Sequence, residues 1–360
     1  MLTQGEQTSL YQRKMRAASR MVLGFHGLQL PQEIRSFQNQ MGAPAGYILF
    51  GRNVSTPEQV HSLNKELSEL TSSGLRSVDQ EGGRVRRIKE VAWPTMRKLG
   101  LSNDIELTKK IAAAMSDELL ALGFNTDWAP VCDVDSNPDN PVIGDRSFSR
   151  DPEICARHAV AFLETAQSKG ILCSAKHFPG HGDTDIDSHL DLPTVDRPLS
   201  SLLKTELPPF KAAIDHGVSL VMTAHVLFPQ LDDLPATMSH AILTGILREQ
   251  LGYTGVIVSD DMEMKAVRGR YPLNLQLDKS CRAGVDLFLV CSEYELQEEI
   301  FEQLVYLQEH DAYHDHLAEQ SLKRIQDIQH RSIQNTTPPA LSLVGCSEHR
   351  HLVSTLMELS

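Results

Sequence analysis

Short apolar runs alternate with longer segments of helical pattern along almost the whole chain. The runs are nearly continuous in apolar residues, which is typical of strands that are covered on both faces. Eight of them occur, at residues 21–27, 46–51, 75–80, 125–134, 171–178, 220–226, 255–260 and 286–292. Such strands separated by helices predict a parallel sheet with helices packed on its outside.

Capping residues mark the helices between these runs. The segment 55–70 begins with Ser-Thr-Pro, which suits the first turn of a helix, and then carries apolar residues at every third or fourth position. The segment 149–170 begins with Ser-Arg-Asp-Pro and ends at Gly170, where the next apolar run starts at once. The segment 292–310 follows the last run in the same manner. Each of these segments predicts a helix.

Eight β/α units within roughly 300 residues are the count and the scale of a (β/α)8 TIM barrel, an α/β fold. A doubly wound open sheet is the second choice, but the first run is followed by HGLQLP and not by the G-x-G-x-x-G of dinucleotide-binding folds. The composition changes only at SIQNTTPPALS, residues 332–342. We therefore expect one catalytic barrel domain over residues 1–331, with residues 332–360 forming either a helix packed on the barrel or a frayed tail.

Composition narrows the class of protein. The 360 residues are 41% hydrophobic and 22% charged, as in a globular protein with a sizeable core, and the formal net charge of −13 argues against a nucleic-acid partner. The apolar stretch near the start is too short for a signal peptide, and no run approaches the ~18 apolar residues of a membrane span. We expect a cytoplasmic protein without a membrane partner. The six cysteines have no CxxC spacing, so we expect buried thiols, neither a disulfide framework nor a zinc ribbon.

Charged residues follow several predicted strands at the end where barrel enzymes carry their active sites. Asp79 ends the third run, Arg146 lies in the segment after the fourth, Lys176 and His177 end the fifth, and Asp260 ends the seventh. Their convergence on one rim predicts a polar site there.

Neighbouring residues have simpler interpretations. We expect Asp261 to cap the following helix, and His225, in an apolar run, to be a hydrogen-bonded core histidine. Glu81 with Gly82 and Gly83 indicates a tight turn, which either lets the backbone approach a ligand or serves the fold alone.

The loop KHFPGHGDTDIDSH, residues 176–189, carries many proton carriers and few apolar residues. Asp187 and His189 are two residues apart, so in an extended segment the carboxylate can orient the imidazole as a general acid/base unit. Gly180 and Gly182 permit hinge motion, so we expect the loop to be mobile. A metal site built from the His and Asp residues, or a polar surface turn, would show the same composition, and both remain open.

The stretch KHFPGHGDTDIDSHLDLP resembles, almost letter for letter, the signature of glycoside hydrolase family 3, and in particular its β-N-acetylglucosaminidase (β-N-acetylhexosaminidase) branch. Four other segments agree in the same order, namely LFGRN (49–53), VDQEGGRVRR (78–87), APVCDV with NPVIGDRSFS (129–149) and GVIVSDDMEMKAV (255–267). The resemblance covers residues from about 20 to about 330.

This resemblance implies a (β/α)8 barrel and a retaining, exo-acting hydrolysis of terminal β-linked N-acetylglucosamine through a covalent glycosyl-aspartate. By matching positions, Asp260 would be the nucleophile, and His189, paired with Asp187, the acid/base. The sugar-binding residues would be Asp79, Arg87, Arg146, Lys176 and His177. The resemblance implies neither a cofactor nor a metal.

The shortness of the chain favours the single-domain bacterial members of this branch over two-domain β-glucosidases. Enzymes similar to it act in peptidoglycan recycling, which implies N-acetylglucosaminyl muropeptides or chitooligosaccharides as substrates. Three alternatives stay open at this point: a β-glucosaminide phosphorylase or another family 3 β-glycosidase, a metal-dependent hydrolase that uses the His/Asp loop, and a sugar-binding barrel without catalysis.

Overall fold

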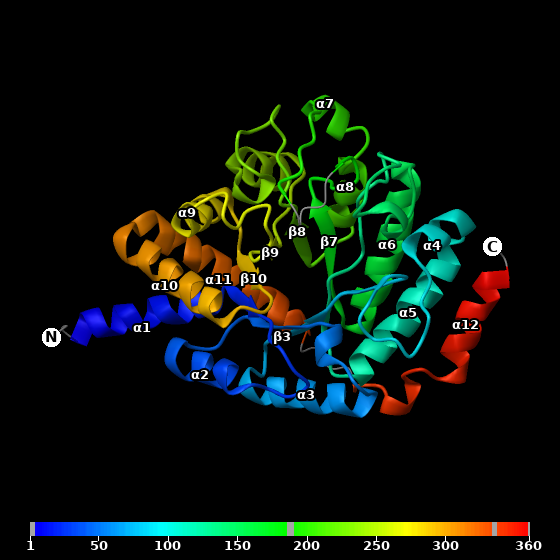
Figure 1. Cartoon of the computed structure of the whole chain (residues 1–360), viewed down its shortest axis with the longest axis horizontal. Helices are drawn as coiled ribbons and strands as arrows, with labels where there is room; N and C mark the ends of the chain where they lie inside the picture. The colour runs from blue at the N-terminus through cyan, green and yellow to red at the C-terminus, as the bar shows by residue number, and fades with distance from the viewer. Residues whose placement is uncertain (1–3, 186–190, 333–336, 359–360) are drawn as a thin grey trace.

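The computed structural model describes residues 4–185, 191–332 and 337–358, and at its centre lies a closed barrel of eight parallel strands (Figure 1). Around the barrel the order is β1-β10-β9-β8-β7-β6-β3-β2, so each strand pairs with its neighbours in the chain. The strands are β1 (Met21–Leu23), β2 (Gly46–Leu49), β3 (Leu75–Val78), β6 (Thr126–Asp127), β7 (Leu172–Phe178), β8 (Leu220–Thr223), β9 (Val256–Asp261) and β10 (Leu287–Val290). Each lies within one of the eight predicted runs except β9, which extends one residue further, and the (β/α)8 prediction is confirmed.

A helix follows every strand and covers the outside of the barrel (Figure 1). These helices are α2 (Gln32–Met41), α3 (Pro57–Leu70), α5 (Ile105–Ala121), α6 (Pro152–Lys169), α8 (Leu207–Asp215), the π-helix η4 (Ala241–Gln250), α9 (Leu273–Ala283) and α10 (Tyr294–His310). The predicted caps are in place. Thr56 accepts a hydrogen bond from the amide of Gln59, Asp151 caps α6, and Gly170 ends α6 in the left-handed region at φ 101°.

Shorter elements decorate the rim of the barrel. They are the hairpin β4 (Gln80–Gly82) and β5 (Val85–Arg86), the helices α4 (Met96–Ser102) and α7 (Leu199–Leu202), and the 3₁₀ turns η1 (Gly51–Asn53), η2 (Gly144–Arg146) and η3 (Ala236–Met238). The hairpin belongs to the loop after β3, η1 to the loop after β2 and η2 to the loop after β6. These loops surround the end of the barrel where the strands finish.

Two layers of apolar packing hold the barrel. The larger one lies between strands and helices, and a smaller cluster of strand residues that includes Val22, Trp128 and Leu289 fills the interior. Ile325 and Ile328 of α11 (Ala312–Ser332) belong to this interior cluster. Helix α11 therefore covers the end of the barrel where the strands begin.

Both ends of the described chain form helices. At the N-terminal end α1 (Gln4–Ala18), which the polar sequence did not predict, packs on α10 and α11, and Arg16 pairs with Asp315. At the other end, η5 (Leu341–Leu343) and α12 (Ser347–Glu358) lie against α5, as Figure 1 shows. There His349 Nδ1 lies 2.9 Å from Glu118 Oε1, and the amide of Gly345 donates to the same oxygen. The described part of residues 332–360 therefore packs on the barrel, which is the first of the two predicted possibilities.

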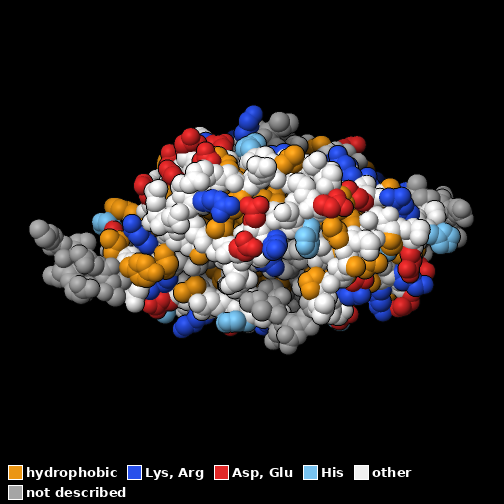
Figure 2. All heavy atoms as spheres, turned by 90° about the horizontal axis from the view of Figure 1, so that it is seen from below, with side chains coloured by type: hydrophobic (Ala, Val, Ile, Leu, Met, Phe, Trp, Pro, Cys, Tyr) orange, Lys and Arg blue, Asp and Glu red, His pale blue; other side chains and the backbone are white. Residues whose placement is uncertain are grey.

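The surface carries charges of both signs (Figure 2), and the cysteines are free thiols. Acidic and basic side chains are interspersed over the face shown in Figure 2. Cys132, Cys173 and Cys291 are buried free thiols, as predicted, and the other cysteines are also free. In the part of the chain that the structure describes, no helix combines the length and the apolar character needed to cross a bilayer.

Candidate active site

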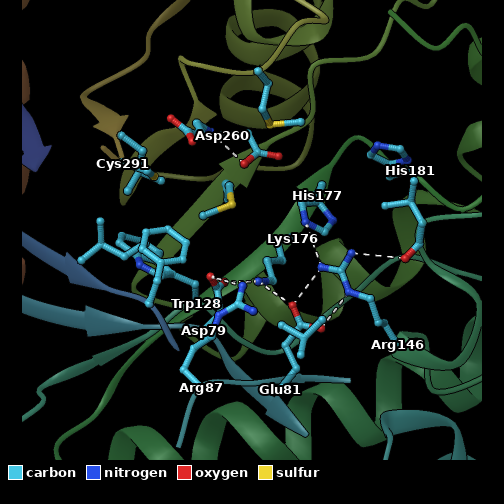
Figure 3. Close-up of a pocket in the computed structure, with 18 of the residues that line it drawn as sticks. Asp79, Glu81, Arg87, Trp128, Arg146, Lys176, His177, His181, Asp260 and Cys291 are labelled. Atoms are coloured by element: carbon cyan, nitrogen blue, oxygen red, sulfur yellow. Dashed lines mark hydrogen bonds and ion pairs between the residues drawn. The ribbon is translucent and has the colours of Figure 1, made fainter. Parts of the chain in front are cut away.

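A cavity of about 260 Å³ opens where the barrel strands end. This volume lies just below the usual range for small-molecule sites, which is roughly 300–1,000 Å³. Apolar side chains that include Ile48, Trp128 and Met222 line it from inside the barrel, and charged side chains line it from the loops. Six of the eight residues predicted from the sequence line this one cavity, namely Asp79, Arg87, Arg146, Lys176, His177 and Asp260 (Figure 3).

Lys176, at the end of β7, forms the centre of an ion-pair network. Its Nζ atom lies 2.8 Å from Asp79 Oδ1 and 2.7 Å from Glu81 Oε1, and only 2% of its side chain is exposed. Burial lowers the pKa of Lys176, but the two carboxylates outweigh it and raise the pKa above its ordinary value. Lys176 is therefore a fixed cation in the wall of the cavity.

Arg146, in η2 after β6, binds the carboxylate of Glu81. Its Nε and Nη2 atoms donate to the two oxygens of Glu81, both at 2.8 Å, in a bidentate pair. Burial raises the pKa of Glu81, but Arg146 and Lys176 outweigh it and hold the pKa well below its usual range. Glu81 thus stays ionised and holds two cations together.

Asp79 faces the cavity between two cations. Arg87 Nη2 lies 3.3 Å from Asp79 Oδ2, and the Arg87 guanidinium sits 5.5 Å from the ring centre of Phe50. Burial raises the pKa of Asp79, but Lys176 and Arg87 outweigh it, and the pKa lies below its ordinary value. With 15% of its side chain exposed, Asp79 remains an anionic acceptor for a ligand.

His177 is oriented by a buried carboxylate that sequence reasoning did not single out. Its Nδ1 atom lies 2.7 Å from Asp133 Oδ2, and its Nε2 atom lies 3.4 Å from Arg146 Nη2. Asp133 also accepts the backbone amides of His177 and His181. Burial raises the pKa of Asp133, but His177 outweighs it and the pKa lies below its ordinary value. An anionic Asp133 fixes the His177 ring towards the cavity.

Asp260 enters from the opposite side. Figure 3 shows its side chain at the end of β9, across the cavity from Asp79 and Glu81, with Lys176 between them. Its Oδ1 atom accepts the amide of Asp261 at 2.8 Å. Two carboxylates that are held by cations therefore face a third one across a space of sugar size.

The structure also shows the roles of Asp261, His225 and Gly82. The helix-cap role for Asp261 is wrong, because the next helix begins only at Leu273, and Asp261 Oδ1 accepts the amide of Glu263 in a turn while its side chain lines the cavity. His225 is a hydrogen-bonded core histidine as expected, with Nδ1 2.9 Å from Thr237 Oγ1. At Gly82 the close approach is to the protein itself, since an added Cβ would lie 2.1 Å from the carbonyl oxygen of Pro94.

The remaining predicted residues, Asp187 and His189, lie outside the described residues. Of the same loop, His181 is described and lines the cavity, with Nδ1 2.8 Å from Thr184 Oγ1. Burial and the neighbouring His177 lower the pKa of His181 to about 4, so its imidazole is neutral at ordinary pH. An added Cβ at Gly182 would lie 1.6 Å from the carbonyl oxygen of Val134, so glycine permits close packing of this loop on the rim.

Sequence reasoning missed Glu81, Asp133 and His181 as parts of the site. Glu81 gave one usable signal, because it lies two residues beyond Asp79 and would point to the same side in an extended segment. Asp133 stood inside an apolar run, and nothing local marked it. Within the described ranges, no group of three or more His, Cys, Asp or Glu side chains has the arrangement of a metal site.

Comparison with known proteins gives a consistent result. The family described as "Glycosyl hydrolase family 3 N terminal domain" matches residues 32–328. A β-hexosaminidase of Hydrogenovibrio crunogenus is 37% identical over 271 residues, which are 73% of this chain and 76% of that protein.

Solved structures show the same similarity. A glycoside hydrolase family 3 β-N-acetylglucosaminidase from Paenibacillus sp. superposes with a TM-score of 0.89 at 35% identity, covering 99% of this chain and 69% of that one. NagZ from Neisseria gonorrhoeae, solved in complex with N-trifluoroacetyl-D-glucosamine, superposes with a TM-score of 0.79 at 31% identity, covering 95% and 97% of the two chains.

Proposed function

Because the chain belongs to glycosyl hydrolase family 3, where it is a glycoside hydrolase of the β-N-acetylhexosaminidase type, we propose that it releases terminal β-linked N-acetylglucosamine with Asp260 as nucleophile. The reaction proceeds with retention through a covalent glycosyl intermediate on Asp260. The observation that carries this assignment is the position of Asp260 across a cavity of about 260 Å³ from the network around Lys176.

The charge pattern favours Asp260 over the other carboxylates. Asp79 and Glu81 are each held by two cations, which ties up their lone pairs and makes them poor nucleophiles. Burial and Glu263 raise the pKa of Asp261 to about 7, so that carboxyl is partly protonated at neutral pH. Among the described residues, Asp260 is the remaining carboxylate that lines the cavity.

The wall of the cavity opposite Asp260 supplies the groups that bind the sugar. Asp79 offers an anionic acceptor for sugar hydroxyls, whereas Lys176, Arg87 and Arg146 offer cationic donors that the network holds in place. Charged groups fixed in advance bind a ring in one orientation and hold it as it distorts towards the oxocarbenium-like state.

Asp187 and His189 complete the proposal on the strength of the resemblance in sequence. His189 protonates the leaving oxygen and later deprotonates water, and Asp187 stabilises the imidazolium. A neutral base avoids placing a second negative charge beside Asp260. No metal or cofactor takes part in these steps.

The proposed substrates are short N-acetylglucosaminyl saccharides, muropeptides derived from peptidoglycan first and chitooligosaccharides second. A cavity of about 260 Å³ suits one terminal sugar, which favours exo action. In peptidoglycan recycling the enzyme would act in the cytoplasm. Comparing kcat/KM for a muropeptide and for chitobiose tests the preference, and a higher value for chitobiose would contradict it.

Trapping the intermediate tests the nucleophile. An activated N-acetylglucosaminyl substrate with a fluorine at C5 slows both steps, and acid quenching followed by peptide mass spectrometry should locate one sugar on Asp260. NMR of the first product should show the β-anomer. A sugar on another residue, an α-product, or an oxazoline formed from the substrate's own acetamide without any adduct would overturn the covalent role of Asp260.

A further inference from the structure

Arg20 is a buried cation at the end of the barrel opposite the cavity. It lies just before β1, and 2% of the residue is exposed. Its guanidinium donates to the carbonyl oxygens of Val285 and Asp286 and, over 3.3 Å, to the sulfur of Cys281. Within the described residues no carboxylate forms an ion pair with it. A buried guanidinium without an anion is costly, so the sulfur is the group placed to balance its charge.

The neighbouring charges do not supply the missing anion. The one fully buried carboxylate there, Asp286, is shared by Arg248 at 2.8 Å and Arg324 at 2.9 Å. Asp278 is likewise shared, since its Oδ1 atom accepts from both Arg282 and His314 at 2.8 Å. A third carboxylate, Asp311, pairs with Arg282. Among the described residues, four arginines (Arg20, Arg248, Arg282 and Arg324) therefore stand against three carboxylates near Cys281, and this surplus favours a thiolate.

His314, on α11, is a second cationic group that interacts with Cys281. Its Nε2 atom is bound to Asp278, whereas its buried Nδ1 atom has no hydrogen-bond partner of ordinary geometry within the described ranges. Burial lowers the pKa of His314, but Cys281 and Asp278 outweigh it and raise the pKa. The raised pKa favours the imidazolium form of His314, which is the form that can donate a proton.

Cys281 differs from the other buried cysteines. Burial raises its pKa, but Arg20 and His314 outweigh it, and the pKa lies below its ordinary value. Burial raises the pKa of the Cys132, Cys155, Cys173 and Cys291 thiols, and no comparable cation reverses it. Of the five buried cysteines, Cys281 is therefore the one whose pKa is lowered.

A small cavity lies beside Cys281, of which 2% is exposed. It has a volume of about 160 Å³ and is lined by Cys281, Arg248, Arg282 and Arg324. Its lining also includes Tyr313, which is 47% exposed, so the cavity reaches the surface. A molecule the size of water occupies about 30 Å³, so hydrogen peroxide fits.

We propose that Cys281 is a thiolate held by Arg20 and His314, and that it is the site at which small hydroperoxides oxidise this protein. The thiolate sulfur attacks one peroxide oxygen, so that an S–O bond forms and the O–O bond breaks. The second oxygen leaves as hydroxide and takes the proton of the His314 imidazolium. Sulfur loses two electrons to become a sulfenic acid, and the peroxide gains them.

The test measures every cysteine of the native chain at once. Hydrogen peroxide is added with a cyclic 1,3-diketone that traps sulfenic acids, iodoacetamide serves as a second probe, and peptide mass spectrometry gives the rate at each site. At pH 7 Cys281 should react at least tenfold faster than the buried Cys173. Between pH 8.5 and pH 6.5 its alkylation should fall less than fivefold, whereas an ordinary thiol falls roughly fiftyfold because its thiolate is lost. Equal rates at Cys281 and Cys173, or a fiftyfold fall at Cys281, would overturn the proposal.

A pair of variants tests the proton donor. His314→Gln keeps a donor to Asp278 but removes the proton, so peroxide trapping at Cys281 should fall at least tenfold. His240→Gln changes a histidine that lines the small cavity but, within the described residues, has no hydrogen bond to Asp278, and it should leave the rate unchanged. Equal rates in both variants would overturn the role of His314. Should His314→Gln fail to fold, the comparison of cysteines in the wild type still decides the proposal.

Discussion

The ammonium group of Lys176 lies 2.7 Å from the Oε1 atom of Glu81, with 2% and 1% of the two side chains exposed. Two charges this far from water depend on each other, because either one alone would be buried without a counterion. Arg146 donates to both oxygens of Glu81, so one carboxylate fixes two cations of the candidate site. The network explains how several charged groups can face one cavity in a stable barrel.

Glu81→Gln should therefore destabilise the protein and impair catalysis. Removing one partner of a buried pair costs roughly 3–5 kcal/mol, and the freed cations should misplace the sugar and lower kcat/KM at least tenfold. Urea unfolding and steady-state kinetics measure both effects. Asp117→Asn breaks the more exposed pair with Lys169 and should cost less than about 1 kcal/mol. Equal costs for the two variants would contradict this account.

Asp79→Asn should weaken binding of the sugar. The change removes an anionic acceptor at the cavity wall, and a hydrogen bond to a charged group contributes roughly 1.5–3 kcal/mol, so kcat/KM should fall about 10- to 150-fold. Glu106→Gln, which breaks the exposed pair with Lys109, serves as the control. The prediction fails if both variants keep wild-type kcat/KM on an N-acetylglucosaminide.

Asp261 should make the free energy of unfolding fall as the pH rises towards 7. Its pKa is raised to about 7, whereas an unfolded aspartate titrates near 3.8, so the folded state holds a proton that the unfolded state has lost between these values. The contribution of Asp261 to stability is thus fully present below pH 4 and declines up to pH 7, by at most roughly 1.4 kcal/mol per pH unit. Asp261→Asn lacks this titration. From pH 4.5 to pH 7.5 the urea midpoint of Asp261→Asn should rise relative to that of the wild type. A difference in midpoint that stays constant with pH would refute the prediction.

The two loop histidines should separate in their effects on the pH–rate profile. His181, with a pKa of about 4, is neutral at working pH, so His181→Gln should keep both limbs of the profile. His189→Ala should lose the limb of the acid/base, with a loss of roughly 10²–10⁴ on a disaccharide and a smaller one on an activated phenol, which needs little protonation. The opposite pattern would move the acid/base role to His181.

The barrel could be predicted from the sequence because its determinants are local. Continuous apolar runs mark the strands, and caps such as Thr56 and Asp151 mark the helices. Helix α1 was missed because its sequence is polar and its packing partners, α10 and α11, lie almost 300 residues away in the chain.

The candidate site could be predicted only in part for the same reason. Residues at strand ends, such as Asp79 and Asp260, are visible to the rule that barrel sites lie at that rim. The role of Glu81 depends on Lys176 and Arg146, which are 95 and 65 residues away in sequence, and Asp133 meets His177 only in the folded barrel. Pairings over such distances are set by the closure of the barrel and leave no local pattern.

The assignment of Asp260 as nucleophile can be tested by measuring turnover of a chromogenic β-N-acetylglucosaminide by the wild type and by Asp260→Asn. Each enzyme is assayed with and without EDTA, and the β-glucoside is the control substrate. Running the same reaction in phosphate buffer distinguishes free sugar from a sugar 1-phosphate. The account predicts turnover selective for the acetamido sugar, release of free sugar, no effect of EDTA, and a loss of at least 10³-fold in Asp260→Asn. Activity that depends on a metal, or that survives in Asp260→Asn, would contradict it.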